Sequence, residues 1–270
     1  MLLYKTIDGP VYNDGDLFFL LEEDWDELLN TENFYDYLFE CQGREAAEPQ
    51  NPLAPIGTQE VWACGVTYLK SRSARMEEAE SAGGGDFYDR VYDADRPEIF
   101  FKAPHYRVKG PGEEVRIRAD SGWDVPEPEF TLVVNKNAEI IGYTIGNDMS
   151  SRSIEGENPL YLPQAKSYDG SCAIGPAIHI LAEPASKDIE ISIIIARSGN
   201  EVFSGSTKLD QMKRELQELV DFLYRELSFP NGAYVMTGTG IVPENDFTLQ
   251  SGDIISISID GVGTLTNTVQ

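Results

Sequence analysis

The sequence predicts a mostly β protein of the α+β class, a mixed β-sandwich roll with a small N-terminal α/β domain. Short runs typical of strands, separated by turn residues, follow one another in the second half of the chain without alternating helices. Only one long segment, late in the chain, has apolar residues at helical spacing. At 270 residues the chain can bury a sizeable core. We therefore expect a small domain over residues 1–60 and a β-roll domain over residues 61–270.

The first 60 residues mix strand-like and helix-like patterns. The strand-like pieces are MLLYKTI and DLFFLLE, and DWDELLNTENFYDYLFEC, residues 24–41, is expected to form a helix. The polar, proline-bearing segment 42–59 is typical of a linker. A strand, EVWACGVTY at residues 60–68, is expected to begin the main body.

Residues 75–98 start with a helical pattern that breaks at three glycines, residues 83–85. A movable lid and an ordinary surface loop both fit this segment. The expected strands that follow are IFFKA, EVRIRA, FTLVV, EIIGYTIG, AIHIL, IEISIIIA and DIISISI. Residues 207–227 have apolar residues at helical spacing, and Thr207 with Asp210 resembles a capping box.

Composition narrows the class of protein. The formal charge is −25, with 46 acidic residues against 21 lysines and arginines, which disfavours binding to nucleic acid. The acids are dispersed, so we interpret them as a solvated, salt-tolerant surface. No apolar run could span a bilayer, the N-terminus lacks a secretion signal, and the three cysteines form no CxxC pair. We expect a cytoplasmic protein without a membrane or nucleic-acid partner.

One motif places acids where a strand begins. In WDVPEPEFTLVV, Glu127 and Glu129 are two apart, so both side chains project from the same face, about 6 to 7 Å apart. The turn signal NKNA then predicts a hairpin with GYTIGND. A turn centred between residues 136 and 137 would set Glu129 opposite Thr144 and Glu127 opposite Gly146. Asp148 would then share their face, whereas a one-residue slip would turn it away.

Three convergent carboxylates repel one another unless a positive charge lies between them. A hard divalent cation with oxygen ligands satisfies this need: Mg²⁺ first, Mn²⁺ or Ca²⁺ next. Three protein ligands would leave positions open for a chelating substrate. The alternative is an exposed pair of glutamates on a strand, which is common in proteins.

Four ordered motifs resemble the fumarylacetoacetate hydrolase superfamily. They are PEPEFTLVV, GYTIGNDMSSR, KSYDGSCAIGP and the terminal YVMTGTG with SGDIISISIDGVGTLTNTV. The resemblance extends over about residues 61–269. It implies a fumarylacetoacetate-hydrolase-like mixed β-sandwich roll, a homodimer or homotetramer, and a divalent metal on the residues that match Glu127, Glu129 and Asp148.

One departure bears on the reaction. Hydrolases of this superfamily carry a Tyr-x-x-His-x-x-Glu element, but here Tyr68 is followed by Ser71 where the histidine would stand. The two histidines of the chain, His105 and His179, lie in a loop-like and a strand-like segment. Without a placed imidazole, activation of water for C–C hydrolysis is poorly supported.

Other segments, YDRVYDADRPEIFFKA and EGENPLYLPQAKSYDG, resemble the branch that dehydrates 2-keto-3-deoxy sugar acids. That resemblance implies metal-dependent dehydration of a 2-dehydro-3-deoxy-pentonate to 2,5-dioxopentanoate. The alternatives are an acylpyruvate-type hydrolase, a 2-oxo acid decarboxylase with the same metal site, and a non-catalytic sandwich that binds metal for stability.

The resemblance also implies roles for single residues. Lys166 would be the base that takes the C3 proton and a substrate contact, and Glu98 would protonate the leaving hydroxyl. Thr239 would contact the substrate carboxylate, and Arg152 would orient either its loop or a metal carboxylate. For Lys166, Glu98 and Thr239 the alternatives are a surface lysine, a surface acid and a glycine-rich turn. Lys102 is either a cation in the pocket or an outward strand residue.

Overall fold

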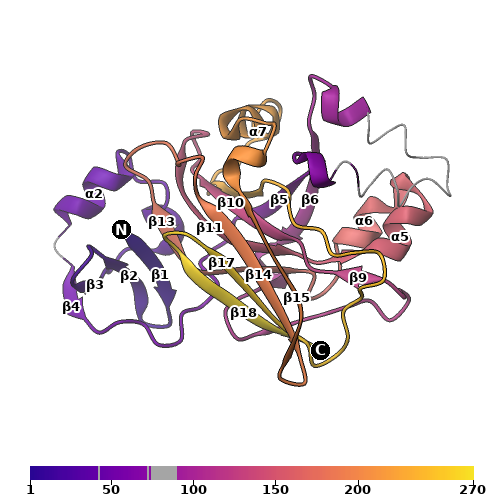
Figure 1. Ribbon diagram of the computed structural model, residues 1–270. Coiled ribbons are helices and arrows are strands. Elements are labelled where there is room, and N and C mark those ends of the chain that lie inside the picture. The colour runs from indigo at the N-terminus through magenta and orange to yellow at the C-terminus, as the bar shows by residue number, and fades with distance from the viewer. Residues whose placement is uncertain (42, 72, 74–89) are drawn as a thin grey trace.

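The computed structural model describes residues 1–41, 43–71, 73 and 90–270, and it consists of two β-sheets with short helices around them (Figure 1). The larger sheet has eleven strands and the smaller one has five, and a two-stranded ribbon lies beside them. Most strand pairs within the described residues are antiparallel, and three are parallel: β5–β16, β7–β13 and β8–β18. The predicted mostly β, mixed-sheet architecture is confirmed.

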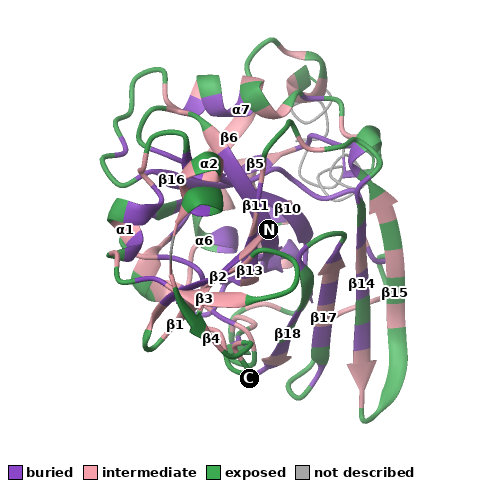
Figure 2. Ribbon diagram, turned by 90° about the vertical axis from the view of Figure 1, so that its left-hand side faces the viewer, coloured by how far each residue is buried: buried purple, intermediate pink, exposed green. Residues whose placement is uncertain are grey.

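The large sheet holds the candidate site in its central strands. In sheet order its strands are β4 (Arg44–Ala46), β3 (Phe18–Leu20), β2 (Gly9–Asn13), β1 (Leu2–Thr6), β13 (Cys172–Ile180), β11 (Ile140–Asp148), β10 (Pro128–Val134), β16 (Ala233–Met236), β5 (Glu60–Gly65) and β6 (Glu98–Pro104), with β7 (Val108–Lys109) beside β13. Every residue of β10 is buried because both faces of this strand are covered (Figure 2). Side chains on β10 are therefore held in fixed positions.

The N-terminal strands extend this same sheet, because β1 pairs with β13 through Leu2 and His179. The single helix expected over residues 24–41 is wrong. Two short helices, α1 (Trp25–Leu28) and α2 (Phe34–Glu40), take its place. Asp24 caps α1, and Asn33 adopts a left-handed conformation that separates the two helices. The expected linker contains strand β4.

The small sheet packs on one face of the large one. Its strands, in order, are β15 (Asn200–Lys208), β14 (Glu190–Arg197), β17 (Ile254–Ile259), β18 (Gly263–Val269) and β8 (Glu114–Val115). Alternate isoleucines of β14 and β17 point inward and meet Phe130 and Leu132 of β10 in one buried cluster. Each isoleucine buried in this way contributes roughly 2 kcal/mol. The expected strand over residues 114–119 is limited to β8.

The long helix expected over residues 207–227 is wrong in its first half. Strand β15 continues to Lys208, and a 3₁₀ turn, η4 (Leu209–Gln211), follows it. Only α7 (Leu216–Leu223) is helical. Thr207 is paired with Ile191 of β14, so sheet hydrogen bonds replace the expected helix cap. Leu209 and Leu219 are nevertheless buried in the core, as their spacing indicates.

The remaining short elements lie at the end of the sheet where β10 begins and β11 ends. They are η2 (His105–Arg107), β9 (Asp124–Val125), β12 (Ser150–Ser151), α5 (Arg152–Glu157), η3 (Pro159–Tyr161) and α6 (Leu162–Lys166). The triple glycine that suggested a lid or a loop lies outside the described residues. Within the described part of the chain, none of the helices is both long and apolar enough to cross a membrane.

Candidate metal centre

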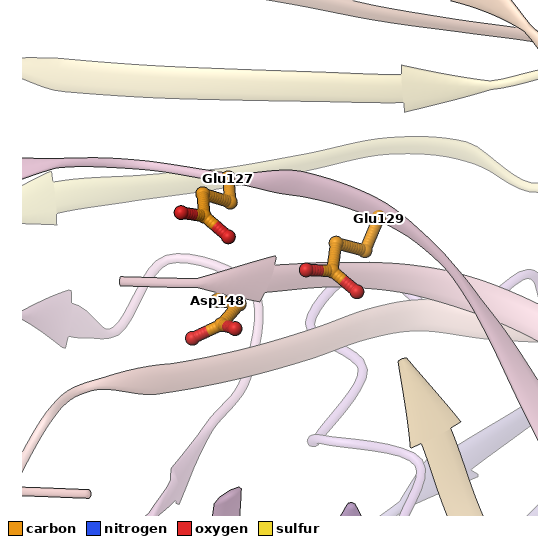
Figure 3. A group of neighbouring side chains, drawn as sticks. All are labelled: Glu127, Glu129 and Asp148. Carbon is orange, nitrogen blue, oxygen red and sulfur yellow. The ribbon is translucent and has the colours of Figure 1, made fainter. Parts of the chain in front are cut away.

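Three buried carboxylates meet at the end of the central hairpin. Glu127, Glu129 and Asp148 each offer an oxygen, and these oxygens lie within 4.8 Å of one another. The three side chains point toward one another, two from the chain entering β10 and one from the end of β11 (Figure 3). The structure therefore brings together the three residues that the sequence singled out as metal ligands.

The predicted hairpin register is wrong by two residues. Glu129 lies opposite Gly146, not Thr144, and Glu127 exchanges backbone hydrogen bonds with Asp148 at 3.2 and 3.0 Å. One residue of the difference arises at the turn, which centres on Asn137, and the other at a register shift after Val133. Because side chains alternate with a period of two, a two-residue shift leaves the same face populated. The expected convergence of the carboxylates therefore holds.

Two glycines lie beside Glu129: Gly146 opposite it on β11 and Gly238 just after β16. A β-carbon at Gly146 would collide with the hydroxyl of Thr131 and with Met236, which share that face. On the other side, the amide of Gly238 donates a 2.6 Å hydrogen bond to Oε2 of Glu129. Gly238 has a φ of +92°, which favours glycine. The Glu129 carboxylate is thus held by a backbone amide at a position that favours glycine.

Three buried bases surround the three acids. Lys166 Nζ lies 2.8 Å from Oε2 of Glu127 and 3.1 Å from Oδ2 of Asp148. Arg152 donates to Oε1 of Glu127 at 2.9 Å, and Lys102 Nζ lies 2.5 Å from Oδ1 of Asp148. Three negative and three positive formal charges therefore balance within this cluster. Burial, reinforced by the nearby Asp148 and Glu127, raises the pKa of Glu129 well above its usual value, and Lys166 opposes the effect.

The cluster fits a hard divalent cation. Its oxygen ligands are those that Mg²⁺ and Ca²⁺ prefer. Oxygens bound to one magnesium ion at about 2.1 Å lie within roughly 4.2 Å of one another. The 4.8 Å spread of the triad is close to this limit, so small side-chain rotations suffice to bring it around an ion. Glu127, Glu129 and Asp148 are the side chains that could hold it.

Lys166 is the last residue of α6, and its side chain is fully buried. Its ammonium group lies against two triad carboxylates and 5.9 Å from the ring centre of Phe100 on β6. A surface lysine, the alternative that the sequence allowed, is therefore wrong. The position suits a proton acceptor or a substrate contact beside the metal site.

Glu98 begins β6, on the same face of the sheet as Glu129. The register that leads from β10 through β16 and β5 to β6 sets Phe100, and with it Glu98, on that face. Glu98 lies opposite Gly65, and a β-carbon at Gly65 would overlap the Glu98 carboxylate. Because Gly65 has no side chain, the side chain of Glu98 can lie across β5.

Thr239 is buried beside the triad, but its hydroxyl forms hydrogen bonds within its own turn. It accepts a hydrogen bond from the amide of Ile241 at 3.1 Å and lies 3.2 Å from the Ile241 carbonyl oxygen. The backbone amide that reaches the triad belongs to the preceding Gly238. A contact between Thr239 and the substrate carboxylate stays a prediction.

Ser71, which replaces the histidine of the hydrolase element, and His179, which was not expected to act as a base, both have structural contacts. Ser71 is buried, and its hydroxyl donates to the carbonyl oxygen of Tyr68 at 2.8 Å. His179 stacks on Tyr143 with ring centres 4.8 Å apart, and its Nδ1 lies 2.9 Å from the carbonyl oxygen of Gly261. These contacts place both side chains in the framework of the fold.

Lys102 is the residue whose place the sequence left open. Lys102 lies two residues after Phe100 and so on the face that carries Glu98 and Glu129, and a β-bulge between Val61 and Trp62 leaves it without a partner on β5. The side chain is buried and reaches Asp148. The available signal was a lysine inside the apolar run IFFKA, and that signal does not distinguish the two faces of a strand.

The family described as fumarylacetoacetate (FAA) hydrolase C-terminal matches residues 70–270. The chain belongs to the fumarylacetoacetate hydrolase family. It is 47% identical over 227 residues to the "Probable 2-keto-3-deoxyxylonate dehydratase" of Haloferax volcanii, over 83% of this chain and 77% of that protein. It is 44% identical over 220 residues to the 2-dehydro-3-deoxy-D-arabinonate dehydratase of Saccharolobus solfataricus, over 80% and 73% of the two chains.

Solved structures of this family resemble the whole chain. One is described as 2-keto-3-deoxy-D-arabinonate dehydratase complexed with magnesium and 2,5-dioxopentanoate. It superposes with a TM-score of 0.86 at 34% identity and covers 100% of this chain and 99% of the other. A hexagonal crystal form of 2-keto-3-deoxyarabinonate dehydratase gives a TM-score of 0.89 at 35% identity, with the same coverage.

Proposed function

We propose that this family member is a Mg²⁺-dependent hydro-lyase that converts a 2-dehydro-3-deoxy-pentonate to 2,5-dioxopentanoate. The observation that carries the proposal is the contact of buried Lys166 with two of the three triad carboxylates. A base and a metal site therefore face the same volume. The similarity to dehydratases over most of the chain, including one described with magnesium and 2,5-dioxopentanoate, supports the substrate class.

Glu127, Glu129 and Asp148 hold the cation in this proposal. Mg²⁺ comes first, and Mn²⁺ or Ca²⁺ would suit the same oxygen ligands. A divalent cation bound there polarises the 2-oxo group of the substrate and so acidifies the C3–H bond. Arg152 keeps its bond to Glu127 and orients that carboxylate.

Lys166 Nζ, as the free amine, accepts the C3 proton. The electron pair of the C3–H bond forms the C3=C4 double bond, and the C4–O bond breaks. Glu98 donates a proton to the departing hydroxyl, which leaves as water. The C3=C4 product then isomerises to the aldehyde. C5 loses one hydrogen and the C5 hydroxyl loses its proton, while C3 and C4 each gain one hydrogen, so no oxidant is needed. Thr239 and the Gly238 turn are proposed to lie along the substrate carboxylate.

A two-substrate assay tests the proposal. The protein is incubated with Mg²⁺ and either 2-keto-3-deoxy-arabinonate or acetylpyruvate, and the products are separated by chromatography. We expect 2,5-dioxopentanoate from the first and no cleavage of the second. Cleavage of acetylpyruvate alone would make the protein a hydrolase, release of carbon dioxide would make it a decarboxylase, and either result would reject the dehydratase. Tight metal binding without turnover of either compound would indicate a non-catalytic sandwich.

We also propose a cytoplasmic homodimer or homotetramer, on the resemblance to the family. Light scattering on a size-exclusion column measures the mass of the particle. A monomer at micromolar concentration would contradict this part of the proposal.

A further inference from the structure

Lys102 connects three parts of the site from a fully buried position. Its Nζ lies 2.5 Å from Oδ1 of Asp148 and donates to the carbonyl oxygen of Met149 at 3.0 Å. It also donates to the carbonyl oxygen of Lys166, the last residue of α6. The ammonium group thus donates two hydrogen bonds, one at the end of β11 and one at the end of α6, and forms an ion pair with Asp148.

The end of α6 is attached to β6 a second time. The hydroxyl of Ser167 lies 2.9 Å from the carbonyl oxygen of Phe101 and 3.0 Å from that of Lys102. The main chain at Lys166 and at Ser167 is therefore attached to β6 by separate hydrogen bonds. A cation at the end of a helix also interacts favourably with the carbonyl groups exposed there.

The two oxygens of Asp148 have different partners. Oδ1 faces Lys102 and Oδ2 faces Lys166. Two hydrogens of the Lys102 ammonium group are bonded to main-chain carbonyls, whereas the hydrogen bonds of the Lys166 ammonium group within the described part of the chain go to carboxylates. The two lysines therefore have different surroundings. Lys102 is bonded to the main chain, and Lys166 faces the carboxylates of the site.

We propose that Lys102 is a positioning residue for the dehydration. It holds Asp148 by one oxygen, fixes the main chain of Lys166 relative to that carboxylate, and balances one of the three buried negative charges. This inference rests on the proposed function for its catalytic part, while its effect on Asp148 concerns metal binding alone.

The charge balance predicts opposite effects of Lys102 on metal binding and on turnover. Without Lys102, Asp148 keeps only Lys166 as an ionic partner among the described residues, so in the metal-free protein its charge is less well compensated and repels the neighbouring acids. Binding of a divalent cation relieves this repulsion, and by linkage the ion is held at least as tightly as in the wild type. Turnover instead falls, because a displaced base loses its alignment, and a misplacement of about 1 Å can cost about 100-fold.

The experiment compares Lys102→Met and Lys102→Gln with Lys187→Met, a control whose ammonium pairs with Glu215 on the surface. Mg²⁺ binding is measured by calorimetry in the absence of substrate, thermal unfolding is followed with and without Mg²⁺, and kcat and KM are measured with 2-keto-3-deoxy-arabinonate. We expect both Lys102 variants to bind Mg²⁺ as tightly as the wild type or more tightly. We also expect Mg²⁺ to raise their unfolding temperature more than that of the wild type, and kcat to fall about 100-fold with little change in KM.

Three results would overturn the proposal: wild-type kcat in both variants, Mg²⁺ affinity that falls in parallel with kcat, or failure of both variants to fold at any Mg²⁺ concentration. The last would show that Lys102 serves the fold as a whole. A wild-type protein that binds Mg²⁺ but does not dehydrate the substrate would instead reject the proposed function. In that case the calorimetric comparison still decides whether Lys102 balances the charge of Asp148.

Discussion

Glu127 and Asp148 form a hydrogen-bonded pair of residues on adjacent chain segments, each donating its amide to the carbonyl oxygen of the other. In such an antiparallel pair the Cα atoms are about 5.5 Å apart and the side chains leave the same face. Two carboxylates are thereby held together by main-chain geometry, and Glu129 joins them from the next position on that face.

Glu129→Gln is expected to weaken Mg²⁺ binding at least about tenfold and to lower turnover in parallel. Because burial raises the pKa of Glu129, removing its charge should leave the metal-free protein at least as stable as the wild type. Calorimetry and thermal unfolding measure the two effects. Exposed Glu183→Gln is the control, and a Glu129→Gln variant with full activity and bound metal would refute the ligand role.

Lys166→Met should retain Mg²⁺ binding but lose exchange of the C3 proton with solvent. A positioned general base contributes about 10²- to 10⁴-fold to proton transfer, so exchange should slow by this factor. Incubation in deuterated water with detection by NMR measures it. Exchange at the normal rate would mean that another group takes the proton.

Gly65→Ala should displace the carboxylate of Glu98, because the added β-carbon would overlap it. We expect kcat to fall about 100-fold, while C3 proton exchange continues because Lys166 is untouched. The matched control is Gly122→Ala, where an added β-carbon would meet none of the described atoms within 4 Å. Equal loss of exchange and turnover would argue against a separate acid at Glu98.

His179 is expected to make the protein less stable in mild acid. Burial lowers the pKa of His179, although the Gly261 carbonyl opposes this, so the folded state favours the neutral ring. As the pH falls through the unfolded value of about 6.5, the unfolded chain takes up a proton first and stability decreases until the lower folded pKa is passed. His179→Phe keeps a ring to stack on Tyr143 and should flatten the dependence of the unfolding free energy between pH 7 and 5. A slope unchanged from the wild type would assign the effect to other groups.

The face shared by the triad could be predicted from sequence because it depends only on alternation along the strands. Spacing set Glu127 and Glu129 on one side, and Asp148 kept its side although the predicted register was wrong by two residues. One residue of the error came from the turn, which centres on Asn137, and the other from the shift after Val133, which has no marker in the sequence. An odd shift would have removed Asp148 from the site.

Other features depend on partners distant in the chain. The apolar spacing around Leu209 is equally satisfied by a strand end, a 3₁₀ turn and a short helix, and pairing of Thr207 with Ile191 decided between them. Lys102 faces the site because it is two residues from Phe100, and only the pairing of β6 through β5 and β16 shows that this is the face of Glu129. The position of the Glu98 carboxylate likewise depends on Gly65, which is 33 positions earlier in the sequence.

Lys102, Arg152 and Lys166 give the acids ionic partners supplied by the polypeptide itself. Domains such as zinc fingers remain unstructured until their ion arrives, because the site and the fold form together. Here the chain can complete its fold first and acquire magnesium afterwards. A shortage of the ion would then inactivate folded molecules, and added ion would restore their activity without new protein synthesis.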